Sequence, residues 1–326
     1  MTALIAAFFS AVFAATSTLI IKCFAKQTDS TVVTTVQSIV MLVFSALVCF
    51  GTGSFSTVSA TDLKSVLFMT ISGIATGLTW LFYYHALKEG DADKVMPIEK
   101  ANIFLTILIA VFFFHETRFF AVKMAGSAVV LFGLLLLAVG SFRAARQGDG
   151  AAESEVYRAQ GRNKGNIANS EERAGTNSAV PCGAGSCRWL RYALLSSLFA
   201  AVNTIFSKLA LAGMNSNFGT LLNTAVALVV VLIFLAGENK LSMLRTAPRK
   251  ELMAVILSGV STAFNWIFYY YAVKYAPMTL AVPLNKLSVP MVILFSHYVL
   301  GSEIKKEQGI GLASIVAGMM MVAVVA

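Results

Sequence analysis

Apolar segments long enough to cross a lipid bilayer constrain this chain more than any other feature. A membrane-spanning helix needs about 20 consecutive, mainly apolar residues, and 57% of the 326 residues are hydrophobic while only 13% are charged. Scanning at that length predicts ten helices, at 3–21, 31–51, 66–86, 96–114, 122–142, 190–208, 218–237, 252–272, 277–299 and 309–326. The alternating ten-residue strands of a membrane barrel are not seen. We therefore predict an all-α membrane protein with ten transmembrane helices.

The sequence repeats itself at a single offset. Residues 72–88, SGIATGLTWLFYYHALK, align with residues 258–274, SGVSTAFNWIFYYYAVK, with nine of 17 positions identical and a shift of 186 (258 − 72 = 186). The same shift pairs Pro97 with Pro283, Lys100 with Lys286, and Gln37 with Asn223. One offset that covers several segments is not expected of unrelated apolar sequence. The chain is therefore predicted to use one five-helix unit twice.

The repeat divides the chain into a first copy at 1–142, a polar segment at 143–188 and a second copy at 189–326. The middle segment is rich in Gly, Ala, Asn, Glu and Arg without apolar periodicity, which predicts a flexible linker. Because five is odd, the second copy enters the membrane from the opposite side, so the repeats are predicted to be inverted. Inverted repeats are typical of secondary transporters, whose substrate site lies where the repeats meet.

The charge of the chain, +9 at pH 7, is a topology signal. If the N-terminus is outside, 18 of the 25 Lys and Arg residues fall on the cytoplasmic side, eight of them between 143 and 191, and five fall on the other side. The positive-inside rule then favours both termini outside. The apolar N-terminal segment lacks the basic start of a secretory signal, and its repeat counterpart at 190–208 is internal. We expect a retained span and no nucleic-acid partner.

The motifs of the two copies resemble a known family. FFSAVFAATSTLIIK, SGIATGLTWLFYYHALK and VMPIEKANIFLTILIAVFFFHET, followed by a glycine-containing last segment, resemble the EamA-type domain of the drug/metabolite transporter superfamily. The second copy, VPLNKLSVPMVILFSHYVLGSE, is similar to the "PIDKLS"-like start of helix four in the half-size bacterial members. The resemblance implies alternating access by two inverted bundles around a central cavity, without ATP, in the cell (inner) membrane. These domains often carry an arginine early in helix two, where this chain has Gln37 and Asn223.

Charged residues near the start of the fourth and ninth predicted helices are the first candidates for a substrate site. Ionisable groups inside spans usually face the bundle interior and mark functional positions, so Lys100 and Lys286 are predicted to bind an anionic group or to pair with Glu99. The alternative is that these lysines extend to the lipid headgroups. Glu99 aligns with Asn285, which makes the carboxylate the asymmetric element and the candidate proton carrier.

Aromatic and amide residues in the third and eighth predicted helices are the second group of candidates. Trp80 and Trp266 lie about two turns deeper than the tyrosines that follow them and are predicted to line the cavity, with Asn265 as a polar neighbour. Pro97 and Pro283 fit the first turn of a helix, where a missing N–H costs nothing. The alternative for these prolines is a broken helix whose backbone groups contact the substrate.

The function predicted from these patterns is secondary active transport or export of a small polar metabolite by alternating access, with proton coupling left open. A flippase for a polar-headed or sugar-linked lipid and a non-transporting scaffold or sensor are the alternatives. No nucleophile–base constellation, metal-ligand spacing or phosphate loop is present in the sequence, so we expect no enzyme activity, no cofactor and no metal. The expected partners are a small-molecule substrate and the lipid bilayer, with a homodimer left open, as are substrate identity and transport direction.

Overall fold

Every regular element in the described part of the chain is a helix. The computed structural model describes residues 2–24, 30–57, 61–89, 102–103, 105–107, 109, 120–146, 188–237, 249–300 and 306–324. The long helices are α1 (Thr2–Phe24), α2 (Ser30–Gly51), α3 (Leu63–Glu89), α6 (Phe120–Arg146), α8 (Arg188–Leu211), α9 (Ser216–Gly237), α10 (Arg249–Tyr275), α12 (Ser288–Leu300) and α13 (Lys306–Val324), with the shorter α11 (Met278–Asn285) and η1 (Ser54–Thr57) between them. The predicted all-α class is confirmed.

Seven of the described spans are long and apolar enough to cross a membrane. Two further apolar stretches, Met124–Leu137 and Gln308–Val322, are shorter. The predicted helix at 96–114 falls mostly outside the described residues. The structure therefore supports a multi-pass membrane protein, and the number of ten spans stays a prediction.

The predicted single helix at 277–299 is interrupted. α11 ends at Asn285, residues 286–287 form a turn, and α12 begins at Ser288. Pro283 lies inside α11, which begins at Met278, so the interpretation of Pro283 as a first-turn residue is wrong. A proline inside a helix removes one backbone hydrogen bond and disturbs the preceding turn. The break named in the alternative is found here, and contact of its backbone groups with a substrate stays a prediction.

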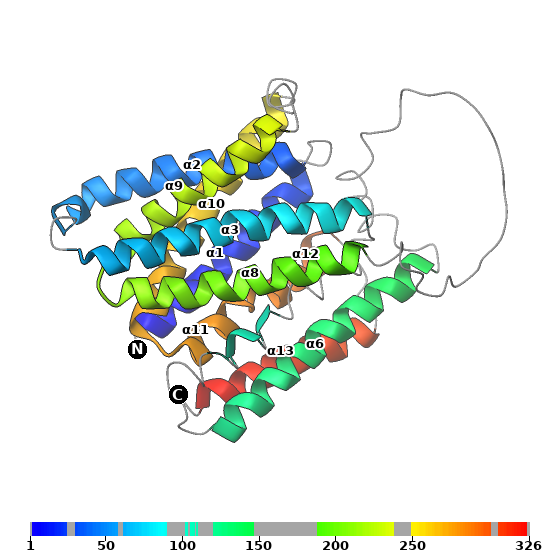
Figure 1. Ribbon diagram of the computed structural model, residues 1–326. Coiled ribbons are helices and arrows are strands. Elements are labelled where there is room, and N and C mark those ends of the chain that lie inside the picture. The colour runs from blue at the N-terminus through cyan, green and yellow to red at the C-terminus, as the bar shows by residue number, and fades with distance from the viewer. Residues whose placement is uncertain are drawn as a thin grey trace.

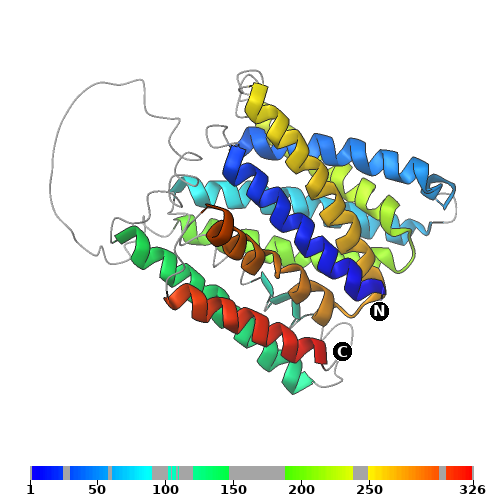
Figure 2. The same ribbon diagram turned by 180° about the vertical axis from the view of Figure 1, so that it is seen from behind.

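Helices of the first copy pack on helices of the second. α1 lies along α10, and α8 lies along α3 (Figures 1 and 2). The hydroxyl of Ser10 lies 2.8 Å from Asn265 Oδ1, and that of Ser17 lies 2.9 Å from Ser258 Oγ, so residue numbers rise along α1 as they fall along α10. These two helices are antiparallel. The same holds for α3 and α8, since the Ser72 hydroxyl meets Asn203 and the Thr79 carbonyl meets Ser196.

The repeat offset relates these two pairs, because α1 corresponds to α8 and α10 to α3. α8 runs parallel to its neighbour α10, with the Lys208 ammonium against the carbonyl of Val273 at the end of α10. Since α10 is antiparallel to α1, the repeat-related helices α1 and α8 run in opposite directions. This is the inverted relation expected of two copies of a five-helix unit.

α6 and α13 form a separate antiparallel pair at one side of the bundle, joined to it through α11 and α12 (Figures 1 and 2). Glycines allow the two backbones to touch. A Cβ atom on Gly126 would lie 2.8 Å from the carbonyl oxygen of Gly318, and one on Gly133 would lie 2.6 Å from that of Gly311. Small residues at such spacing are the usual means of close helix packing in membranes.

The bundle has two ends, which we call the Arg188 face and the Met214 face after one residue at each. α8 begins, α1 ends and α2 begins at the Arg188 face. α8 ends, α9 begins and α10 ends at the Met214 face, where both described termini of the chain also lie (Figure 1). Termini on one face fit an even number of crossings.

Candidate functional site

A cavity of about 260 Å³ lies between α2, α3 and α10. Its lining comes from both copies of the repeat and consists of Thr34, Gln37, Ser38, Met41, Trp80, Tyr83, Thr262 and Trp266. The α2 residues belong to the first half of that helix and the α3 residues to the second half of α3, so the cavity lies toward the Arg188 face. None of these side chains is an acid or a base.

The two tryptophans of this cavity are repeat counterparts (80 + 186 = 266). Both are half-buried. Trp266 makes edge-to-face contacts with Tyr269, with ring centroids 5.9 Å apart, and with Tyr270, with centroids 5.4 Å apart. Such contacts fix the ring orientation, so one face of the cavity is an aromatic wall held in place. The structure thus brings Trp80 and Trp266 to one cavity, and their role in binding a substrate stays a prediction.

A polar network joins α1, α2 and α10 beside the cavity. The Ser17 hydroxyl lies 2.9 Å from the Ser258 hydroxyl and 2.7 Å from the Thr262 hydroxyl. The Gln37 amide donates to Ser258 Oγ and, at 3.5 Å, to Ser17 Oγ. Gln37 and Thr262 also line the cavity. We call these four residues the first network.

A second network occupies the corresponding place between α8, α9 and α3. Asn223 Nδ2 donates to Ser72 Oγ over 2.9 Å, and the Ser72 hydroxyl donates to Asn203 Oδ1 over 2.6 Å. The Thr76 hydroxyl donates to Asn223 Oδ1 over 3.3 Å. Adding or subtracting 186 converts each member of the first network into a member of this one. Within the membrane, where water is scarce, such interhelical bonds satisfy groups that would otherwise be costly to bury.

Asn265 and Asn285 meet in a third polar cluster, apart from the residues that line the cavity. Asn285 Nδ2 donates to Asn265 Oδ1 over 3.1 Å and to Ser10 Oγ over 2.5 Å, and the Ser10 hydroxyl lies 2.8 Å from Asn265 Oδ1. The cluster ties the last turn of α11 to α1 and α10. Asn265 is therefore a neighbour of Trp266 along the chain but contacts a different part of the bundle.

The structure places only some of the predicted charged residues. Lys286 is half-buried at the turn between α11 and α12, where its backbone N–H donates to the Pro283 carbonyl over 2.8 Å. It is not one of the residues that line the cavity. Lys100 and Glu99 lie outside the described residues. A role of these three residues in binding stays a prediction.

Sequence reasoning missed most of the hydroxyl groups at this site. Ser17, Ser258 and Thr262 were not singled out, although each aligns with a polar residue in the other copy. Polarity kept at equivalent positions of two apolar helices is the signal that would have identified them. Thr34, which lines the cavity, was also missed.

The chain resembles known proteins over nearly its whole length. The profile of the EamA-like transporter family matches residues 1–139 and 188–324. A Sinorhizobium protein named as an uncharacterized transporter in the cobO 3′ region is 35% identical over 136 residues, which are 96% of that protein and 42% of this chain. An uncharacterized protein of Methanocaldococcus jannaschii is 25% identical over 87 residues, 27% of this chain and 63% of that protein.

A solved crystal structure of a protein shares the fold, with a TM-score of 0.74 at 15% identity over all of this chain and 97% of that one. The family match covers well over half of the sequence in two stretches, and the structure shows apolar helices of membrane-spanning length. On this evidence the chain belongs to the EamA-like transporter family and is a multi-pass membrane transporter.

Proposed function

We propose that the protein is a secondary transporter that moves a small polar metabolite across the cell membrane by alternating access, and that the cavity between α2, α3 and α10 binds the solute. The observation that carries the proposal is the pair Trp80 and Trp266. These residues are equivalent in the two inverted copies, yet they border one cavity. A site on which both copies converge is reached by movement of either copy, which is what alternating access requires.

The lining supports a particular class of solute. Hydroxyl and amide groups from Thr34, Gln37 and Thr262 offer both donors and acceptors, while the indole rings and Met41 offer apolar surface. Indole faces also attract cations. We infer a small organic molecule with hydrogen-bonding groups and either an apolar or an amine-bearing portion. An anionic solute would have to draw its counter-charge from Lys100 or Lys286, outside the lining described here.

A ligand screen on the purified full-length chain tests this proposal. A solute that binds the folded state stabilises it, by about 2.7 kcal/mol when the solute concentration is a hundred times its dissociation constant. This stabilisation raises the apparent melting temperature. We expect hits among soluble polar metabolites. Each hit is then tested for flux in proteoliposomes, and a pH gradient is imposed with and without Glu99→Gln to test proton coupling.

Tryptophan fluorescence locates the binding site. The chain has three tryptophans, and Trp189, at the start of α8 and not among the residues that line the cavity, is the control. A solute-dependent fluorescence change should survive in Trp189→Phe and fall in Trp80→Phe and Trp266→Phe. A signal carried by Trp189 alone would contradict the site. Hits confined to lipid-linked sugars would favour the flippase alternative, and no hit or flux for any solute class would favour the scaffold.

A further inference from the structure

The two repeat-related regions differ in burial. Around the cavity, Thr34, Gln37 and Thr262 are half-buried. Their counterparts at +186 or −186 are Thr220, Asn223 and Thr76, which are 1%, 2% and 2% exposed. The local bonding is otherwise alike: Ser38 donates to the Thr34 carbonyl over 2.7 Å, and Thr224 donates to the Thr220 carbonyl over 2.7 Å. At these three pairs of positions the first region is more exposed than its counterpart, whereas Ser38 and Thr224 are buried alike, at 2% and 1% exposed. We call the two the open and the closed region.

Close packing of α3 on α9 keeps the second region closed. A Cβ on Gly73 would lie 2.7 Å from Val226 Cβ, and a Cβ on Gly77 would lie 2.7 Å from Val230 Cβ. The equivalent contact of α10 on α2 uses Gly259, whose added Cβ would lie 2.8 Å from Val40 Cβ. One turn further, however, α10 has Ala263 where α3 has Gly77. The α3–α9 contact is thus free of a methyl group that α10 carries.

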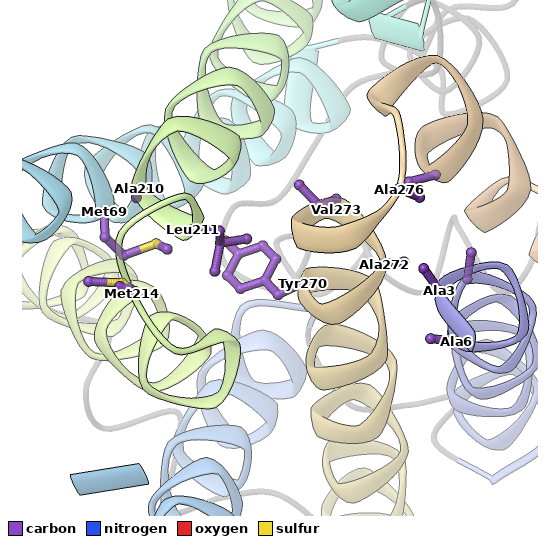
Figure 3. Packing of buried hydrophobic residues seen from close by; sticks show 12 residues of the cluster. Ala3, Ala6, Met69, Ala210, Leu211, Met214, Tyr270, Ala272, Val273 and Ala276 are labelled. Atoms are coloured by element: carbon purple, nitrogen blue, oxygen red, sulfur yellow. The ribbon is translucent and has the colours of Figure 1, made fainter. Parts of the chain in front are cut away.

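Two lysines and an apolar cluster also close the Met214 face. The Lys208 ammonium donates to the carbonyls of Val273, over 2.5 Å, and Ala276, over 2.7 Å, at the end of α10. The Lys274 ammonium donates to the Met214 carbonyl over 2.7 Å. Beneath them, the side chain of Leu211 lies against the ring of Tyr270 (Figure 3). α8, α9 and α10 are held together at this end of the bundle.

We propose that Thr76, Thr220, Asn223 and Thr224, buried in this structure, line the solute cavity when it faces the Met214 face, and that Trp80 and Trp266 line it in both states. This inference rests on the proposed transport cycle and names the residues that line the cavity in the second of its two states. If each copy adopts the present conformation of the other, the Thr, Gln and Ser residues that line the cavity are replaced by their counterparts at an offset of 186, which are these four residues. The pair Trp80 and Trp266 maps onto itself, so the aromatic wall is shared.

The same comparison predicts which substitution opens the closed region. Gly77→Ala gives α3 the methyl group that Ala263 already carries on α10, while the facing residue on α9 remains Val230, where α2 has Phe44. The new Cβ would meet Val230, a branched side chain on a helix, which has to move away. Overpacking of this kind weakens the contact in which it occurs. Gly77→Ala is therefore expected to increase the population of the state that faces the Met214 face.

Cysteine labelling of the full-length chain tests the proposal. The four native cysteines, Cys23, Cys49, Cys182 and Cys187, are replaced by serine. Thr34→Cys and Thr220→Cys then report on the open and closed regions, and Val130→Cys, fully buried between α6 and α13, gives the background rate. Labelling with a small water-soluble maleimide is timed with and without Gly77→Ala. Ile74→Ala, at a position of α3 that is 41% exposed, is the control substitution.

We expect Thr34→Cys to react at least about tenfold faster than Thr220→Cys. Gly77→Ala should raise the Thr220→Cys rate about tenfold, because overpacking of one contact changes the ratio of the two conformations by about that factor. Ile74→Ala should change neither rate. If Gly77→Ala does not give a monodisperse protein, Lys208→Gln, which removes the contacts to the end of α10, replaces it with the same expectation.

Two results would overturn the inference. One is a Thr220→Cys rate that stays at the Val130→Cys background in every variant. The other is a rise of the Val130→Cys rate together with that of Thr220→Cys, which would mean general loosening. Flux measured in the same proteoliposomes separates the two proposals: flux without labelling of Thr220→Cys refutes the second lining alone, whereas reciprocal labelling without flux of any solute refutes transport and keeps the conformational exchange.

Discussion

The two polar networks make a prediction about stability, because one is buried and the other borders a cavity. Asn223→Ala removes an amide that accepts from Thr76 and donates to Ser72 within a buried environment. Interhelical hydrogen bonds in membrane proteins contribute about 0.6 kcal/mol each on average and up to about 1.7 kcal/mol. The empty volume left by the side chain adds roughly another 0.5 kcal/mol. We expect Asn223→Ala to lower the free energy of unfolding by about 2 kcal/mol.

Gln37→Ala removes the corresponding amide from the first network, where it bonds to Ser258 and, at a long 3.5 Å, to Ser17. Gln37 lines the cavity, so water can enter the space that the amide leaves and bond the two hydroxyls in its place. We expect a loss below about 1 kcal/mol. Gln37 and Asn223 are amides at equivalent positions of the two copies, yet loss of the Gln37 side chain should lower the free energy of unfolding less than half as much as loss of the Asn223 side chain.

Thermal unfolding of the purified variants in detergent measures the difference. With an unfolding entropy of about 2.1 cal/mol/K per residue and 326 residues, 1 kcal/mol corresponds to about 1.5 °C. Asn223→Ala should therefore melt about 3 °C lower than the parent, and Gln37→Ala about 1 °C lower. Asn217→Ala, which loses one exposed bond to Thr52, is the control and should lie within about 1 °C. Equal shifts for Gln37→Ala and Asn223→Ala would refute the reasoning from burial.

Two further predictions concern other parts of the bundle. Gly318→Ala places a methyl group 2.6 Å from the carbonyl oxygen of Gly126 and should cost about 1–3 kcal/mol in the same assay, whereas Gly309→Ala, on the same helix with nothing within 4 Å, should be neutral or slightly stabilising; equal melting temperatures would contradict the α6–α13 packing. In a chain with Cys182 and Cys187 replaced by serine, the half-buried Cys23 should react with maleimide at least about tenfold faster than Cys49, which is 0% exposed, as mass spectrometry of the labelled protein would show.

Helix positions were largely predictable, because a continuous apolar run has few alternatives to a helix in a bilayer. The predicted segment 31–51, for example, is α2 at Ser30–Gly51. The turn at 286–287 was not predicted as the preferred outcome, since Pro283 is compatible with both a helix start and a break. Hydropathy cannot distinguish the two, because it is averaged over about 20 residues, and the two-residue turn with Lys286 leaves the segment Met278–Phe295 apolar enough to span a membrane.

The repeat predicted which helices are equivalent but not which helices touch. Equivalence of α1 and α8 leaves open whether α1 packs on α3 of its own copy or on α10 of the other, because both partners carry the same motif. Of the residues that line the candidate site, the tryptophans were predicted and the threonines were not. Trp80 and Trp266 stand out as large polar-edged rings in apolar helices, whereas Thr262 also bonds to the Ser258 carbonyl of its own helix, as threonines in spans commonly do.

The pairing of α1 with α10 has a consequence for the synthesis of the chain. α1 ends at Phe24 and α10 begins at Arg249, so α1 leaves the ribosome 225 residues (249 − 24 = 225) before its main packing partner. Until then its serines at positions 10 and 17 have no native hydrogen-bond acceptors from α10 and face lipid or temporary neighbours. Long-range pairings of this kind form late in folding. We expect the first copy to stay an open assembly of inserted helices, and the bundle to close only after the second copy has entered the membrane.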